Sequence, residues 1–159
     1  PDWVKEQLMD IGIDPEEAIL ASAKEGTGIE EILEAIVERV PVPPENHDKS
    51  LRALVFDSVY YSYQGVIAYV RIVDGKISKG QKIKMMANDN EYEVDEVGVF
   101  NPEMKEVASL QSGEVGYIIA GIKDVKNCRV GDTITKTKNQ AETPLPGYKK
   151  VKPDRKSVV

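Results

Sequence analysis

Three consecutive residues, Ser22, Ala23 and Lys24, have the types needed to hold the edge of a guanine base. Backbone N–H groups in such a turn suit the O6 acceptor of guanine and oppose the amino group of adenine. The stem of Lys24 can lie along the face of the base while its ammonium group stays in water. A polar turn in front of a helix has the same composition, so both interpretations stay open for these residues alone.

A complete nucleotide site needs further loops, and this sequence does not contain them. A phosphate loop requires Gly-x4-Gly-Lys-Ser/Thr. Gly75 with Gly80, and Gly116 with Gly121, have the glycine spacing but lack the Lys and hydroxyl residues that should follow. The Asp-x-x-Gly pattern at 95–98 falls inside a predicted strand, and we interpret it as coincidence. We therefore expect no catalytic residue, no metal site and no cofactor in this chain by itself.

The single histidine and the single cysteine exclude further kinds of site. His47 and Cys128 cannot form a Cys/His zinc cluster, and one cysteine cannot make an internal disulfide, which favours a reducing, cytoplasmic compartment. Lys126 and Arg129 are close to Cys128 in sequence and could lower the pKa of its thiol. No apolar run approaches the roughly 18 residues that span a membrane, and Pro1 suggests a piece excised from a longer protein.

The charge divides the chain into two halves. Residues 1–50 hold 13 acidic and 4 basic side chains, whereas residues 51–159 hold 14 acidic and 17 basic ones. The first half is therefore unsuited to phosphate, and the second half could bind it if its cations share a face.

A basic stripe is predicted in the second half, where Lys82 and Lys84 alternate with Ile83 and should point to one face of a strand. Such a stripe can meet an RNA backbone, although it can also be the ordinary wet face of a sheet. The candidate RNA-facing residues are Arg71, Lys76, Lys79, Lys82 and Lys84.

Three tyrosines, Tyr60, Tyr61 and Tyr63, precede Gly65 in a predicted turn. They could stack on bases or pack as a rim, and packing is the simpler interpretation.

The first half predicts helix, strand and helix. A helix from Asp2 to about Ile11 should stop at Gly12, and Ala18–Ala21 is apolar like a buried strand. Thr27 and Glu30 form a predicted capping box for a second helix, which Pro41 should end. The apolar face of that helix contains Ile29, Ile32, Leu33, Ile36, Val37 and Val40.

The second half predicts strands only. Residues 41–50 are rich in proline and predict a linker. Turns at Asp74-Gly75 and Lys79-Gly80 are typical of tight antiparallel connections. Several short strands at this spacing favour a small closed barrel. The predicted strands are Leu51–Tyr60, Val66–Asp74, Gln81–Met86, Glu91–Phe100, Val115–Ile119 and Thr133–Thr137.

These stretches resemble a known family. SAKEGTGIEEILEAIVERVP, residues 22–41, resembles the last guanine-recognition loop and final helix of the GTPase domain of translational GTPases. LRALVFDSVYYSYQGVIAYVRIVDGKISKGQKIK, residues 51–84, resembles the start of their second domain. EVDEVGVFNPEM, LQSGEVGYIIAGIKDV and VGDTIT then follow in the order of LepA-type elongation factor 4. The alternatives are a BipA-type factor and an elongation factor G-like protein.

The resemblance implies a mainly β fold. Residues 46–145 would form a small six-stranded, translation-factor-type closed β-barrel, the second domain of these factors. Residues 1–45 would be the C-terminal α/β fragment of a P-loop GTPase domain. Residues 146–159 would begin a further domain or form a foreign tail.

The resemblance also implies the activity of the longer parent protein. Such factors bind GTP and Mg²⁺, act on the tRNA-bearing ribosome, and are proposed to promote back-translocation or to aid initiation and fidelity. The barrel would dock on small-subunit ribosomal RNA and proteins and couple the nucleotide state to other domains. Alternatively, it could couple domains without touching RNA. The family's base-binding residues correspond in this sequence to three positions only, Ser22, Ala23 and Lys24. The family is cytoplasmic with possible peripheral membrane association, and nothing in the sequence indicates a homo-oligomer.

Overall fold

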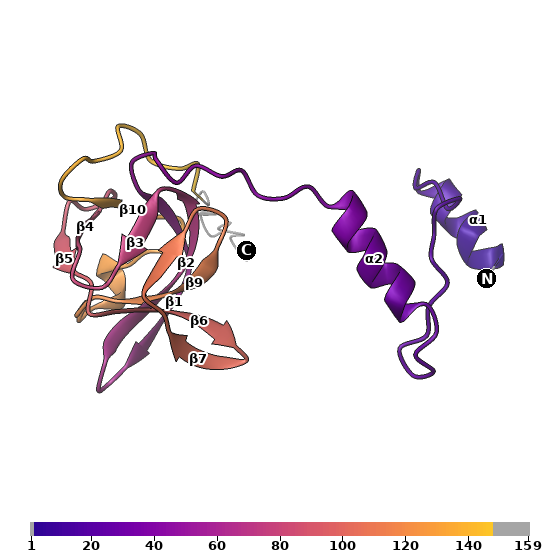
Figure 1. Cartoon of the computed structure of the whole chain (residues 1–159), viewed down its shortest axis with the longest axis horizontal. Coiled ribbons are helices and arrows are strands. Elements are labelled where there is room, and N and C mark those ends of the chain that lie inside the picture. The colour runs from indigo at the N-terminus through magenta and orange to yellow at the C-terminus, as the bar shows by residue number, and fades with distance from the viewer. Residues whose placement is uncertain (1, 148–159) are drawn as a thin grey trace, which may run out of the picture. The chain divides into compact units, whose positions relative to one another are not determined.

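The computed structural model describes residues 2–147, in which two α-helices precede ten strands along the chain (Figure 1). The chain divides into two compact units between Val42 and Pro43. The assignment of residues 1–45 to a GTPase domain and of 46–145 to its neighbouring barrel domain stays a prediction. Most of the predicted third segment, residues 148–159, lies outside the described residues.

The first unit begins with α1 (Asp2–Asp10), which ends as predicted. Gly12 has a φ of 82°, a left-handed conformation that favours glycine. Its N–H donates to the carbonyl of Met9 at 3.0 Å, and the N–H of Ile13 donates to the carbonyl of Leu8 at 2.9 Å. This pair of bonds is a Schellman motif, and it confirms Gly12 as the stop signal.

The start of α2 (Ile29–Arg39) differs from the prediction. The capping box of Thr27 and Glu30 is wrong, because the N-cap is Gly28 and no side chain caps the helix. Gly28 has a φ of 72°, and a Cβ at this position would lie 2.3 Å from the carbonyl oxygen of Leu20. Only glycine fits this close approach of two backbone segments, so the chain uses the turn rather than a side-chain cap. The helix ends before Pro41, as predicted.

The predicted strand at Ala18–Ala21 is also wrong, because these residues form no strand. A strand needs a neighbour for its N–H and C=O groups, and the ladder contact here is an isolated bridge between Ser22 and Thr27. Neither helix buries a residue. Large apolar side chains of this unit are exposed, among them Trp3 (68%) and Val37 (82%). The first unit therefore has no hydrophobic core of its own among the residues described.

The second unit is a β structure built on an eight-stranded ladder, in the order β5-β4-β10-β1-β2-β9-β6-β7, with a separate β3-β8 pair. Every pairing in both sheets is antiparallel. The strands are β1 (Arg52–Tyr61), β2 (Gly65–Asp74), β3 (Lys76–Ser78), β4 (Lys82–Met85), β5 (Glu91–Glu93), β6 (Glu96–Asn101), β7 (Glu103–Glu106), β8 (Ser109–Gln111), β9 (Val115–Ile119) and β10 (Thr133–Lys136).

The ladder returns on itself where β5 meets β6. The predicted single strand Glu91–Phe100 is bent at this point, and its two parts pair with different neighbours. The N–H of Val94 donates to the carbonyl of Gln81 beside β4 at 2.9 Å, and the N–H of Asp95 donates to Ile119 of β9 at 2.8 Å. The ring therefore has six positions, namely β4, β10, β1, β2, β9 and the bent strand. This arrangement agrees with the predicted small six-stranded barrel.

Three strands were absent from the sequence prediction, namely β3, β7 and β8. The turn glycines Gly75 and Gly80 do have positive φ values, of 74° and 77°. However, the tight antiparallel connections predicted at these turns are wrong, because β3 pairs with β8 rather than with β2 or β4. All four residues of β7 are exposed, so it carries no alternation of buried and exposed residues that a sequence could reveal.

The core fills the interior of the barrel with aliphatic side chains. Val66, Ala68, Val70 and Ile72 of β2 alternate inward and are at most 1% exposed. Each fully buried aliphatic side chain contributes about 1.5–3 kcal/mol relative to an exposed one. The barrel therefore has its own source of stability.

Residues 43–46, directly before the barrel, are bound to it by Ser112, which is 8% exposed. The hydroxyl oxygen of Ser112 accepts the N–H of Asn46 at 3.2 Å. It also lies within donating distance of the carbonyls of Val73 (2.8 Å) and Pro44 (3.0 Å). The N–H of Gly75 adds a bond of 2.8 Å to the carbonyl of Asn46. The predicted linker is thus fixed to the barrel over these residues, which we call the strap.

Replacing Ser112 by alanine should destabilise the barrel by about 1–3 kcal/mol, because it leaves buried polar groups without partners. The amide of Asn46 should then exchange its hydrogen faster, as measured by hydrogen–deuterium exchange. Ser109→Ala, at the start of the strand that ends just before Ser112, is the matched control. Unchanged exchange at Asn46 would show that the strap is held by other contacts.

Candidate nucleic-acid interface

The predicted base-binding turn is closed by its own hydrogen bonds. The N–H of Ser22 donates to the carbonyl of Thr27 at 3.0 Å, and the N–H of Gly26 donates to the carbonyl of Ser22 at 2.8 Å. The hydroxyl of Ser22 accepts the N–H of Glu25 at 3.3 Å. Ala23 and Lys24 are exposed at the top of the turn. The hydrogen bonds within residues 2–147 do not engage the N–H groups of these two residues, which leaves them available to an acceptor.

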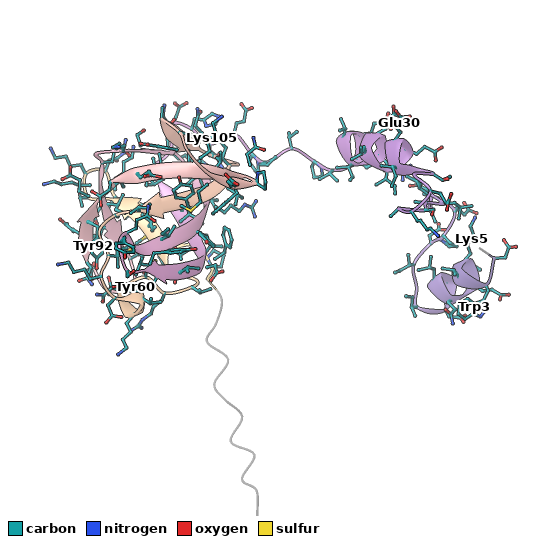
Figure 2. The ribbon with its side chains drawn as sticks, turned by 90° about the horizontal axis from the view of Figure 1, so that it is seen from below. Trp3, Lys5, Glu30, Tyr60, Tyr92 and Lys105 are labelled. Atoms are coloured by element: carbon teal, nitrogen blue, oxygen red, sulfur yellow. The ribbon has the colours of Figure 1, made fainter. Side chains whose placement is uncertain are left out.

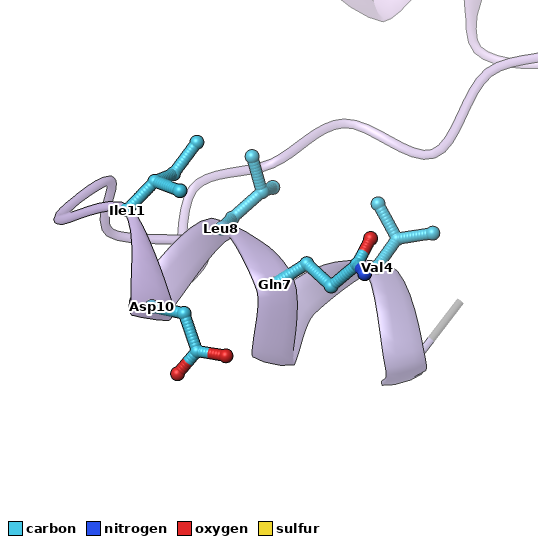
Figure 3. Close-up of a pocket in the computed structure, with 5 residues that line it drawn as sticks. All are labelled: Val4, Gln7, Leu8, Asp10 and Ile11. Atoms are coloured by element: carbon cyan, nitrogen blue, oxygen red, sulfur yellow. The ribbon is translucent and has the colours of Figure 1, made fainter.

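In the same unit, α1 carries a shallow hollow of about 420 Å³. Figure 3 shows Val4, Leu8 and Ile11 projecting from one side of the helix, with Asp10 on the other. An open apolar surface with a single amide and a single carboxylate has no converging polar groups, so we assign no site there.

The five predicted RNA-facing residues do not form one stripe. Lys82 and Lys84 do share a face of β4 as predicted, because Ile83 between them is buried. However, β4 is separated from the strand of Arg71, β2, by β10 and β1 in the sheet order. Lys76 is exposed on β3, which belongs to the other sheet.

Two of these five residues, both of them lysines, are paired with acids of the barrel. Lys79 pairs with Glu106 at 3.0 Å, and this hydrogen bond raises the pKa of Lys79 above its ordinary value. Lys84 pairs with Asp89 at 2.6 Å. Cations that already have a carboxylate partner are weaker candidates for binding phosphate.

The hairpin between β1 and β2 projects aromatic side chains instead. Tyr60, Tyr61 and Tyr63 are 53%, 47% and 99% exposed, so the prediction that they pack as a rim is wrong. Figure 2 shows Tyr60 on the side of the barrel away from Lys105. We call residues 60–65 the tyrosine tip. Gly65 ends it, because a Cβ there would lie 2.7 Å from the carbonyl oxygen of Ile122.

A second segment, residues 121–130, runs beside the tyrosine tip, and we call it the basic loop. The N–H of Val66 donates to the carbonyl of Ile122 at 2.8 Å, and the hydroxyl of Ser58 donates to the carbonyl of Cys128 at 3.2 Å. Within the loop, the carboxylate of Asp124 caps a short 3₁₀-helix, Val125–Asn127.

The basic loop exposes three cations, Lys123, Lys126 and Arg129, and none of them is in an ion pair within residues 2–147. A hollow of about 350 Å³ is lined by Tyr60 and Lys123, and one of about 630 Å³ by Lys126 and Arg129. Exposed aromatic rings beside unpaired cations are the combination that binds single-stranded nucleic acid. Sequence reasoning missed this pairing, because about 60 residues separate the tyrosines from the cations.

Cys128 belongs to the basic loop, but its side chain is fully buried. Burial, together with the charge of Asp132, raises the pKa of its thiol to about 12. The prediction that Lys126 and Arg129 could lower this pKa is therefore wrong, since desolvation outweighs the nearby cations. The thiol is an inert core group.

Asp132 supports the same end of the barrel and is 6% exposed. Its Oδ1 accepts the N–H groups of Ala87 (2.9 Å) and Thr133 (2.7 Å). Its Oδ2 has no partner among the described residues. Burial raises the pKa of this carboxyl, against the opposing effect of the two hydrogen bonds and of Arg129.

Because the pKa of Asp132 is raised in the folded state, protonation of this carboxyl stabilises the fold. The stabilisation is fully present below the ordinary pKa of aspartate, and it is lost as the pH rises through the folded-state pKa. Asp132→Asn keeps an acceptor for both N–H groups but removes the titration. We therefore expect the difference between the two melting temperatures, variant minus unmodified chain, to shift in favour of the variant as the pH rises from about 4 to about 7. A difference that stays constant across this range would contradict the assignment.

Within residues 2–147, no group of three or more His, Cys, Asp or Glu side chains is arranged to hold a metal ion. None of the helices in that range has the length and apolar character needed to cross a membrane.

Comparison with known proteins agrees with this architecture. Residues 65–135 match the family model described as elongation factor Tu domain 2. Over 153 residues, the chain is 55% identical to elongation factor 4 of Aquifex aeolicus, which covers 96% of the chain and 26% of that protein. It is 54% identical over 154 residues to elongation factor 4 of Bacillus subtilis, covering 96% of the chain and 25% of the relative.

Elongation factor 4 of Thermosynechococcus vestitus is 55% identical over 154 residues, again covering 96% of the chain and 26% of that protein. The chain spans about a quarter of the length of these curated relatives. The mainly β fold, the family model and the identity over nearly the whole chain point to one conclusion: the chain belongs to the elongation factor 4 family.

Proposed function

We propose that the chain joins the end of a GTPase domain to the barrel domain of an elongation factor 4. In this proposal, the barrel docks on the RNA of the small ribosomal subunit through the tyrosine tip and the basic loop. The observation that carries the proposal is the meeting of three exposed tyrosines with three unpaired cations on two adjacent segments.

The chemistry of this surface favours RNA. Tyrosine rings stack on unpaired bases with about 1–3 kcal/mol per base, and lysine and arginine contact phosphates. Arg71, Lys76, Lys79, Lys82 and Lys84 become weaker candidates, since they are dispersed over the barrel and two of them are paired with acids.

The turn of Ser22, Ala23 and Lys24 would hold the guanine base of GTP in the longer protein. Its two available N–H groups support that role. The phosphate and Mg²⁺ loops are missing from this sequence, so we expect the isolated chain to hydrolyse no GTP. Action on a tRNA-bearing ribosome follows from the family. The translation step affected and peripheral membrane association stay predictions.

A second candidate function is favoured by the strap. Because the strap fixes the chain to the barrel directly after the first unit, the barrel could serve as a coupling module that transmits movement without touching RNA. The two candidates differ in whether the isolated chain binds ribosomal subunits.

The test is cosedimentation of the chain with purified 30S and 50S subunits at several salt concentrations. RNA docking predicts binding to 30S subunits that weakens as salt rises, because each phosphate contact releases counterions. Binding to neither subunit, or equal binding to both, would reject this docking and leave the coupling function.

Stacking by the tyrosine tip gives a separate prediction. Replacing Tyr60, Tyr61 and Tyr63 by alanine should weaken 30S binding by at least about tenfold, since each stacked base contributes 1–3 kcal/mol. Replacing all three by phenylalanine keeps the rings and should change affinity much less. Equal losses in the two variants would show that the hydroxyl groups, rather than the ring faces, make the contact.

A further inference from the structure

A hollow of about 290 Å³ lies where β4 begins and β10 ends. Two bonds hold the strand ends together here, because both the N–H (3.1 Å) and the hydroxyl (3.3 Å) of Thr137 donate to the carbonyl of Lys82. Three lysines, one amide and one hydroxyl residue line the hollow: Lys82, Lys136, Lys138, Gln81 and Thr137.

The lysines of this hollow lack the ion pairs found nearby. Lys79 and Lys84 each have a carboxylate partner, whereas no acid of residues 2–147 lies within ion-pair distance of the three lining lysines. One carboxylate, Glu93, stands directly opposite Lys82 in the β4–β5 ladder. The lining itself holds three cations and no acid, so the hollow carries an excess of positive charge.

Such an excess is unfavourable in the free protein. Two unit charges 4 Å apart interact by about 1 kcal/mol in water and by more near a protein surface. A bound anion reverses the sign of this interaction. A phosphate group fits best, because its several oxygens can accept from lysine ammonium groups, which act as point charges, and from neutral donors such as Gln81.

The hollow is distinct from the surface proposed to dock on RNA. Ala53 pairs with Ile134, which places the end of β10 beside the start of β1. The tyrosine tip lies at the other end of β1, a ten-residue strand. At about 3.3 Å per residue, the strand separates the two by roughly 30 Å.

We propose that the hollow between β4 and β10 is a binding site for a phosphate group. The group comes from one of two sources: the phosphodiester backbone of RNA, or a free phosphate-bearing small molecule. The site goes beyond the docking function above, since it uses other residues at the other end of the barrel.

The test is titration of the full chain with inorganic phosphate, followed by ¹H–¹⁵N NMR, against chloride at equal ionic strength. Phosphate should shift the backbone signals of Lys82 and Thr137. In Lys136→Gln/Lys138→Gln, the affinity for phosphate should fall by up to about thirtyfold, since two exposed charge contacts are lost. The matched control is Lys76→Gln/Lys105→Gln, which removes two exposed lysines that do not line the hollow.

Shifts of equal size in chloride, or equal phosphate affinity in both double variants, would overturn the proposal. A well-dispersed spectrum of each variant verifies that it folds. A second titration adds a single-stranded oligoribonucleotide. Displacement of phosphate identifies the RNA backbone as the source, whereas unchanged signals at Lys82 identify a small molecule. The triple alanine variant of the tyrosine tip should keep phosphate binding, so failure of the docking function and failure of this site are distinguishable.

Discussion

Exchanging Lys123, Lys126 and Arg129 for glutamate is expected to lower the affinity of the chain for 30S subunits by at least about a hundredfold at low salt. The three cations are exposed and lack ion pairs within residues 2–147, so they are accessible to phosphate. If each contacts one phosphate, the slope of log K against log salt should fall by about 2–3, since each contact contributes about 0.7–0.9. Cosedimentation across a salt series measures both quantities.

The matched control carries the same change of charge at Arg71, Lys76 and Lys105, which are exposed elsewhere on the barrel. Its net charge equals that of the test variant, so any difference reports the position of the cations rather than their number. If the control loses as much affinity as the test variant, the binding is non-specific attraction between a charged barrel and RNA.

The second large effect concerns stability. Replacing Gly98 by alanine should destabilise the barrel by about 3 kcal/mol. This value lies between the usual free-energy cost of overpacking a core and the cost of removing a buried aromatic ring. The new Cβ would lie 2.3 Å from the ring of Tyr117, which crosses over Gly98. The ring cannot move without loss, because its hydroxyl donates to Glu96 at 2.6 Å and its face contacts Phe100 with centroids 5.5 Å apart.

Urea unfolding of a double-mutant cycle tests this cause. In a Tyr117→Ala background, Gly98→Ala should cost much less, because the atoms that its Cβ meets belong to the side chain of Tyr117. Gly116→Ala is the contrasting control, since its Cβ would lie 2.2 Å from the backbone carbonyl of Gly98 and should stay costly in that background. If both glycine substitutions cost the same with and without Tyr117, backbone conformation rather than the ring is responsible.

The sequence predicted the elements that carry a clear period. The strand at Val115–Ile119 was predicted to the residue, and both helices were placed to within about one residue at their C-terminal ends. Period-two burial in β2 and a left-handed glycine after α1 are local signals, so a single sequence is enough to read them.

The errors have non-local causes. The strand at Ala18–Ala21 failed because a strand depends on a neighbour, and the capping box failed because Gly28 must let two backbone segments approach. Likewise, the basic stripe was predicted from residues within a single strand–turn–strand segment. The structure instead brings Lys123 beside Tyr60, and Lys136 near Lys82, from distant positions in the chain. Such contacts depend on barrel closure, which sequence spacing does not encode.

Directed hydroxyl-radical cleavage from the tyrosine tip tests the central claim most directly. Cys128 is fully buried, with the pKa of its thiol raised to about 12, so an iron chelate on Ser62→Cys would label the tip alone. With 30S subunits, docking through the tyrosine tip predicts cleavage of the small-subunit RNA at a few sites, and none of these from the control position Asn101→Cys on the β6–β7 hairpin. The same cleavage pattern from both positions, or no cleavage from Ser62→Cys despite binding, would contradict it.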